Sequence, residues 1–564
     1  MYAKGGALTS IAKVSEIKGN NSIGYVLENV TKDITIPGTI TLTEASSTGQ
    51  FGVVAMGTGK GLTVSGVSVA GGKNIGISST TGGAVTNTGT LSVGNSTSSK
   101  NSAIGIYSQG GAITSSGAVT VGNNSIGVYG EKTSVTTGAM TVGDKGVGIS
   151  LANTAAGQGN ATVNGNVSVG NGAVGIQASN AAVSVANLSV GNGNAKGIYA
   201  TGAGNVTATG NLSAGDKSVA IFKNGTGTVN VGTTGLGNTT KVGNDAYGII
   251  SQGSNVVNNT NITAGINSVG AYVENANLAS TGSVKVGDKG VGLFLKGGAG
   301  NTLSSNGALN IGSNSSVGLY TEGANISQIG AMNIAANNGI GVYSKGTGSV
   351  ATNGNITVGN DSIGVYKSGS GTMNIGTTGQ TLSVGDKGYG IYYLGGTSSN
   401  STINSNMNMA LGKEGVGIYG KNTTITQKGN ITVGETTVGP NGYSNPNVNK
   451  NSIGVFGDNS NITYTGTMNV NHPLSVGIYG MNGGNIKLQN ATLNVSNGAT
   501  GIMTGKGVNS ITVDNKSVIN VDGKATSPDA SSANVSFGIA AYSGIIENKG
   551  KIKVSNGATG IYVA

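Results

Sequence analysis

The stretch Asn124-Ser125-Ile126-Gly127-Val128-Tyr129 recurs in variant form along most of the chain. Its core is an aliphatic residue, a glycine, a second aliphatic residue and often an aromatic residue. With Ala220 standing for one glycine, the core occurs at twenty sites, and most steps between sites are 21 to 29 residues. A period in this range is typical of a solenoid, in which each repeat packs mainly on its neighbours.

A longer period is superimposed on the short one. Positions 76, 148, 220, 292 and 364 are each 72 residues apart, so three short repeats form one higher unit. We therefore predict three regions within one continuous array. Residues 1–70 form less regular coils that include Gly24 and Gly52, residues 71–434 form regular repeats, and residues 435–564 carry two insertions.

Each repeat is expected to supply three short strands. In residues 117–130, Val119 and Val121 alternate with polar residues, a Gly-Asn-Asn corner follows, and Ile126 and Val128 alternate again. A third, weaker strand is expected around Val135. Three strands in a coil of about 22–29 residues predict an all-β fold, a right-handed parallel β-helix of about 20 or more coils. Neither the 18-residue coil of a left-handed helix nor a leucine-rich frame fits.

Strand alternation predicts which side chains face the core. The residue after the repeat glycine is aliphatic at all twenty sites and is expected to point inward. The same alternation places the glycine and the second residue after it on the outside. The residue before the glycine is expected at the entry of the strand, where its side chain can lean outward. Asn, Asp and Gly at the corners are explained by their tolerance of left-handed backbone, without a metal.

The outward position two residues after the glycine is Tyr or Phe at fourteen of the twenty sites. One interpretation is a structural stack that shields the neighbouring glycines. The other is an exposed aromatic strip that binds sugar rings or a partner protein. The candidate binding residues on this column are Tyr343, Tyr366, Tyr392 and Tyr419.

The two insertions span about 435–450 and 522–535 and contain prolines, which the strand ladder rejects. Loops on a rigid scaffold often carry recognition, although an insertion with no role is an equal alternative. The candidate binding residues in these loops are Pro440, Tyr443, Pro446 and Pro528.

Composition limits the possible partners and chemistry. The net charge of +10 comes entirely from scattered lysines, and the absence of arginine argues against sequence-specific nucleic-acid binding. The absence of cysteine rules out disulfides and thiolate sites, and it reflects either chance or unfolded passage through an oxidising compartment. The single histidine, His472, precedes a proline, and no catalytic, phosphate-binding or metal-binding motif is present. We predict a non-enzymatic protein without cofactor or metal.

The repeats resemble the passenger region of type V autotransporters, in particular the very large fusobacterial outer-membrane adhesins. The segments that carry the likeness are 356–366 (ITVGNDSIGVY), 382–392 (LSVGDKGYGIY) and their relatives between about 70 and 564. The resemblance implies a secreted virulence protein on the bacterial surface. Its implied partners are a host protein receptor, such as an immune-cell receptor, a glycan or another bacterium.

Members of that family carry a signal peptide and a C-terminal membrane barrel. Neither is recognised in this sequence, whose last residues stop within a predicted strand, so we expect a segment of a longer chain. Two further functions stay open. The segment could be a purely structural stalk that presents a binding domain elsewhere, or, as the weakest alternative, an enzyme acting on polysaccharide.

Overall fold

The computed structural model describes residues 1–7, 11–14, 16–45, 48–57, 59–312, 314–335, 337–396, 400–435, 451–523 and 535–564. It divides into two compact units, unit 1 (Met1–Thr281) and unit 2 (Gly282–Ala564). Within each unit the strands pair in parallel, coil upon coil, and this confirms the predicted parallel β-helix. In the described ranges the helical content is a single 3-10 turn, Ser99–Asn101.

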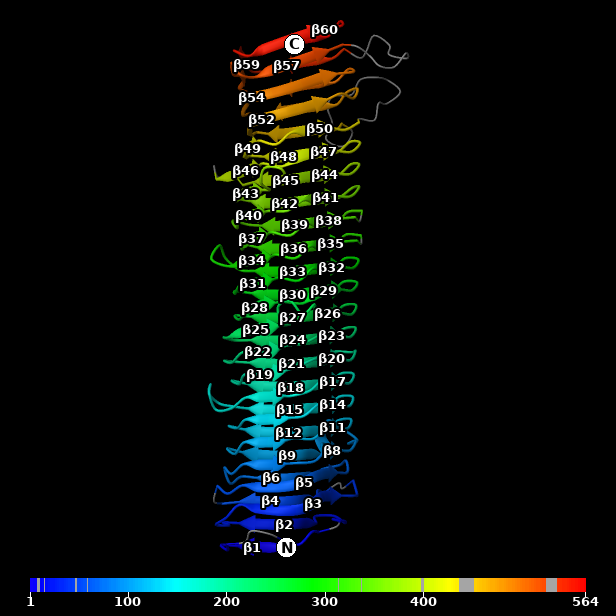
Figure 1. Cartoon of the computed structure of the whole chain (residues 1–564), viewed down its shortest axis with the longest axis vertical. Helices are drawn as coiled ribbons and strands as arrows, with labels where there is room; N and C mark the ends of the chain where they lie inside the picture. Colours follow the sequence, from blue (N-terminus) through cyan, green and yellow to red (C-terminus); the bar gives the residue numbers. More distant parts are fainter. Residues whose placement is uncertain are drawn as a thin grey trace. The chain divides into compact units, whose positions relative to one another are not determined.

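One coil of unit 1 shows the plan of most coils. Its strands are β12 (Ile126–Glu131), β13 (Val135–Thr137) and β14 (Met140–Val142), and those of the next coil are β15 (Val147–Ala152), β16 (Ala161–Val163) and β17 (Val167–Val169). Each strand pairs with its equivalent one coil later, as Val128 with Ile149. Figure 1 shows β12, β15 and β18 (Val174–Ser179) one above another.

The first strand of each coil is the longest of the three in most coils, and we call the sheet that these strands form the long-strand sheet. In unit 1 it contains β1 (Tyr2–Lys4), β2 (Ile23–Glu28), β4 (Phe51–Met56), β6 (Ile75–Ser79), β9 (Ile104–Gln109), β12, β15, β18, β21 (Lys196–Thr201), β24 (Val219–Asn224), β27 (Tyr247–Gln252) and β30 (Val269–Glu274). In unit 2 it contains β33 (Val291–Lys296), β36 (Val317–Glu322), β39 (Ile340–Lys345), β42 (Ile363–Gly369), β45 (Tyr389–Gly395), β48 (Val416–Lys421), β51 (Ile453–Asp458), β53 (Val476–Met481), β55 (Thr500–Thr504), β58 (Phe537–Ala541) and β61 (Thr559–Val563).

Coil lengths agree with the sequence period. Paired residues lie 21 apart between Ile126 and Val147 and 29 apart between Ile75 and Ile104. The two longest coils pair Val416 with Ile453, and Thr500 with Phe537. Each of these steps is 37 residues, so each insertion is accommodated within one coil. Strand pairing resumes in register on its far side.

The aliphatic residue after each repeat glycine forms the centre of the core, as predicted. This side chain is 0 % exposed in every coil from Ile77 to Ile539. The exception is Ile561 in the last strand, which is 41 % exposed. At about 1.5–3 kcal/mol for each fully buried aliphatic side chain, this column is a major source of stability.

The repeat glycine itself faces the core, so the prediction that it lies outside was wrong. Gly127 and Val128 are both buried, while Ile126 and Tyr129 on either side are half-buried. Regular alternation is therefore interrupted, and the strand register passes from Ile126 to Val128 without a partner for the glycine. A Cβ on Gly127 would lie 2.6 Å from the carbonyl oxygen of Gly148 and 2.7 Å from a methyl group of Val121.

This close approach explains why glycine recurs at the site, and it gives a testable expectation in unit 2. A Cβ on Gly341 would lie 2.6 Å from the Gly364 carbonyl oxygen and 3.0 Å from Ile334. We expect Gly341→Val to lower the free energy of unfolding by about 1–3 kcal/mol, the usual cost of overpacking. Gly298→Val is the matched control, because no atom lies within 4 Å of a Cβ there. Equal urea midpoints for the two variants would contradict this account.

The corner before the long strand is held by a ladder of side-chain amides and carboxylates. The Oδ1 atom of Asn123 accepts a hydrogen bond of 2.8 Å from the backbone N–H of Asp144, and Asp144 in turn accepts one of 2.7 Å from Asn171. The next residue along is left-handed, as predicted for Asn and Asp at these corners, with φ of 54° at Asn124 and 51° at Asp361, although Lys145 takes the same conformation with φ of 56°. Asn and Asp at the corners are thus explained both by tolerance of left-handed backbone and by bonding between coils.

Candidate binding surface on the long-strand sheet

Eight aromatic residues of unit 2 form one run of ring contacts on the outer side of the long-strand sheet, stacked from Tyr320 to Tyr419 and edge-on at Phe294 and Phe456. We call this run the unit 2 ladder, and its members are Phe294, Tyr320, Tyr343, Tyr366, Tyr392, Tyr419, Phe456 and Tyr479. Neighbouring ring centroids are 4.5 to 5.4 Å apart. These distances lie at the short end of the favourable range for aromatic pairs, each worth about 0.5–1.5 kcal/mol beyond burial.

The four predicted tyrosines occupy consecutive rungs of this ladder. Their rings are nearly parallel, with interplanar angles of 10° between Tyr343 and Tyr366, 10° between Tyr366 and Tyr392 and 22° between Tyr392 and Tyr419. Each ring face is therefore covered by the neighbouring ring. The half-buried side chains present their ring edges outward. This geometry favours the structural interpretation for ring faces and leaves the edges available to a partner.

The aromatic column of unit 1 is interrupted. Tyr107 stacks on Tyr129 at 5.6 Å, and Tyr199 stacks on Phe222 at 5.0 Å. The two coils between these pairs carry Ser150 and Gln177 at the ladder position. A long uninterrupted run of stacked rings is therefore a feature that distinguishes unit 2.

A second apolar column runs beside the unit 2 ladder, at the residue before each repeat glycine. Val317, Ile340 and Ile363 are half-buried there, as expected for a side chain that leans outward. Further along, the two columns close into a buried cluster made by Ile453, Phe456, Val476 and Tyr479, with Tyr419, Met481 and Met503 against it. The partly exposed part of this face therefore spans the six strands β33, β36, β39, β42, β45 and β48, although in β48 only Tyr419 is half-buried and Val416 is fully buried.

Charged residues form a third column at the other margin of the ladder. The hydroxyl of Tyr320 donates a 2.8 Å hydrogen bond to Glu322, and the Lys345 ammonium lies 4.0 Å from the same carboxylate. Burial, together with the Glu322 carboxylate, raises the pKa of Tyr320 well above its ordinary value. Burial likewise raises the pKa of Tyr419. Both phenols therefore stay protonated across the physiological range.

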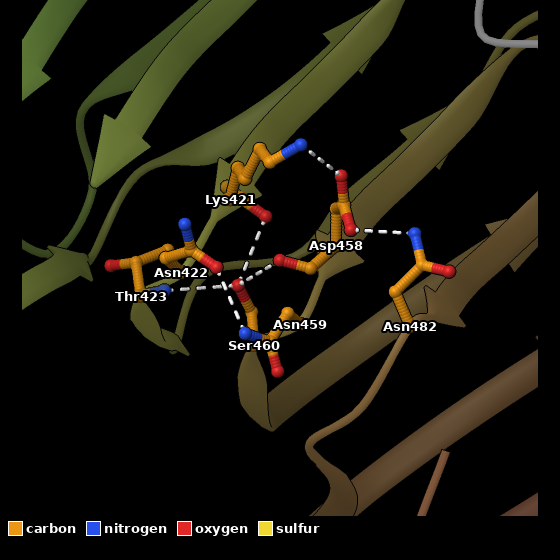
Figure 2. A network of polar contacts seen from close by, with 8 residues as sticks. Lys421, Asn422, Thr423, Asp458, Asn459, Ser460 and Asn482 are labelled. Atoms are coloured by element: carbon orange, nitrogen blue, oxygen red, sulfur yellow. Dashed lines mark hydrogen bonds and ion pairs between the residues drawn. The ribbon is translucent and has the colours of Figure 1, made fainter. Parts of the chain in front are cut away.

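Figure 2 shows the polar network at the end of this column, where the chain turns out of β48, β51 and β53. Asp458 is 8 % exposed, lies 3.2 Å from the Lys421 ammonium and accepts a 2.9 Å hydrogen bond from Asn482. The hydroxyl of Ser460 accepts a 3.1 Å bond from the backbone of Thr423 and donates one of 3.0 Å to the Gly420 carbonyl. The network joins three coils and holds the margin of the face rigid.

Two buried lysines were not predicted. The Lys223 side chain is 1 % exposed and donates to the Gly202 carbonyl. Lys367 is 0 % exposed and donates hydrogen bonds of 3.1 and 2.5 Å to the carbonyls of Gly346 and Gly348. The signal in the sequence was the match between 222–227 and 366–371, 144 residues apart, which places a lysine at an inward-facing position in both segments.

The remaining predicted site residues, Pro440, Tyr443, Pro446 and Pro528, lie outside the described residues. In the part of the chain that the structure describes, no group of three or more His, Asp or Glu side chains is placed to hold a metal ion. Within the same part, no helix has the length and apolar character needed to span a bilayer. The expected absence of metal and cofactor stays a prediction.

Comparisons with known proteins found no match. No family model, no curated protein and no solved structure matches the chain.

Proposed function

We propose that this chain is a segment of a bacterial surface protein that mediates attachment, as in the autotransporter passengers that its repeats resemble. The observation that carries the proposal is the outer face of unit 2, where half-buried aromatic and aliphatic columns run beside a charged margin. Contiguous apolar surface of this kind commonly marks an interaction site. The implied partners are a host receptor, a glycan or another bacterial surface, and the implied location is the cell exterior.

The proposal is tested with the full chain and three ladder substitutions, Tyr343→Ser, Tyr366→Ser and Tyr392→Ser, combined in one variant. We expect binding to host cells, glycan arrays, immune receptors or partner bacteria, and its loss in the variant. The matched control is Tyr107→Ser with Tyr129→Ser, which removes a stacked pair from unit 1. Circular dichroism checks that both variants keep their strands. No binding by the wild-type chain to any of these partners would contradict the proposal.

A purely structural stalk is the second candidate, and the parallel stacking of the rings favours it because each ring face is occupied within the chain. Deleting 435–450 and 522–535 from the full-length protein separates the two functions. A stalk tolerates both deletions and the ladder substitutions without loss of attachment. Release of reducing or unsaturated sugar ends by the purified chain would instead support a polysaccharide-acting enzyme.

A further inference from the structure

The margin of the unit 2 face carries two oppositely charged residues, Glu322 and Lys421, that lie two strands to either side of β42. From β33 to β48 the outward residue at the end of the strand is Lys296, Glu322, Lys345, Ser368, Leu394 and Lys421 in turn. Read in both directions from Ser368, this order places Glu322 opposite Lys421, and Lys345 opposite Leu394. The ladder is symmetric about Tyr366, with tyrosine at the two rungs on either side.

Only one arrangement of two copies uses this symmetry. A two-fold axis lying in the interface and running along the strands keeps each column opposite the same column and reverses the order of its coils. The two copies then run antiparallel, and the interface is isologous, so every contact occurs twice. A two-fold axis along the stacking direction would set each column against a different column, and Glu322 would not meet Lys421.

We infer that the outer face of β36 to β48 binds the same face of a second copy of this chain, antiparallel, with the two-fold axis at Ser368. The proposal stands on unit 2 geometry and does not depend on the proposed attachment function. The half-buried aliphatic residues of β36, β39 and β42 and the aromatic ladder supply the apolar contact, and the two Glu322–Lys421 pairs between copies select the orientation. Both side chains are partly exposed, at 34 % and 47 %, and each also has a polar partner within its own copy.

The size of the face sets the expected affinity of the dimer. Five strands about 4.8 Å apart and six residues of about 3.3 Å cover roughly 24 by 20 Å, or about 950 Å² over both copies. Stable interfaces begin at about 1,200 Å². The dimer is therefore expected to be weak and to dissociate on dilution. Exposed ion pairs contribute only about 0–1 kcal/mol each, so the columns carry most of the affinity.

Sedimentation velocity of the full chain over a range of concentrations tests the pairing. We expect a monomer–dimer equilibrium that Glu322→Lys weakens at least about 10-fold, because each of the two Glu322–Lys421 pairs becomes a pair of lysines. Adding Lys421→Glu together with Asp458→Asn, which removes the carboxylate beside residue 421, should restore the dimer, since the pairs between copies are swapped rather than lost. Glu131→Lys, at the same place of a unit 1 coil, should leave it unchanged. A chain that stays monomeric throughout, or a charge-swapped variant no better than Glu322→Lys alone, would overturn the inference.

Cysteine cross-linking tests the axis directly, because the chain has no cysteine of its own. Ser368→Cys should form an intermolecular disulfide under mild oxidation, since the axis brings residue 368 to its own copy. Ser179→Cys, at the matching place in unit 1, is the control and should react much more slowly. Equal cross-linking at the two positions would place the contact elsewhere. A monomer whose ladder instead binds a glycan or a foreign protein would show that the face has a different occupant.

Discussion

Replacing Lys367 by alanine is expected to lower the free energy of unfolding by about 2–5 kcal/mol, the range for truncating a large buried side chain. The substitution empties part of the core and leaves the Gly346 and Gly348 carbonyls without their donor. Lys345→Ala in the preceding coil is the control, since that side chain is 61 % exposed and surface substitutions usually cost under about 0.5 kcal/mol. Urea unfolding and hydrogen exchange in β42 measure the stability of both variants. Equal losses for the two variants would show that the buried ammonium has no special role.

The same lysine should give the stability a distinctive pH dependence. Burial lowers the pKa of Lys367 to about 8, against about 10.4 in an unfolded chain. Between these values the folded state has released the proton and the unfolded state still holds it, so stability rises with pH across this window. The rise is on the order of 3 kcal/mol at most, and Lys367→Met should abolish it. If the free energy of unfolding of that variant still rose equally with pH, other groups would be responsible for the rise.

The sequence was sufficient for the fold because its signal is repeated in almost every coil. The period followed from spacing and the inward aliphatic column from alternation; strand pairing confirms the first and burial the second, while three strands per coil hold in most coils. Alternation failed at the repeat glycine, where two successive residues such as Gly127 and Val128 both face inward. Nothing in an aliphatic-Gly-aliphatic pattern distinguishes a glycine that faces solvent from one pressed against Val121. Only the interatomic distances of the folded coil decide it.

The candidate surface was predictable only in part. The aromatic column could be read from spacing, but spacing does not say whether rings such as Tyr366 and Tyr392 stack or splay. The buried lysines ran against the usual expectation that lysine is exposed, because the carbonyls that satisfy Lys367 come from residues 21 and 19 positions earlier. The placement of Glu322 and Lys421 on either side of Ser368 becomes visible only when residues from successive coils are placed in register.

Raising the pH above about 10, the ordinary pKa of tyrosine, is expected to unfold unit 2 cooperatively. Burial raises the pKa of Tyr320, Tyr419 and Tyr464 well above that value. The folded state keeps these protons when the unfolded state has lost them, so the stability they contribute is complete below pH 10 and falls as pH rises further. Together with Lys367, this predicts a stability maximum between about pH 8 and 10.

The tyrosinate absorbance and the β-strand circular dichroism, recorded during one titration, measure this transition. Because Tyr464 is 0 % exposed, its ionisation requires the coils to open, and we expect the absorbance to rise in step with the loss of strand signal. Tyr464→Phe keeps the ring and removes one buried ionisable group, so its stability should fall less steeply above pH 10. Ionisation of all the tyrosines at their ordinary pKa with the strand signal intact would show that the ladder is open to solvent. The close ring contacts from Tyr320 to Tyr419 would then not explain the burial of the rings on this face.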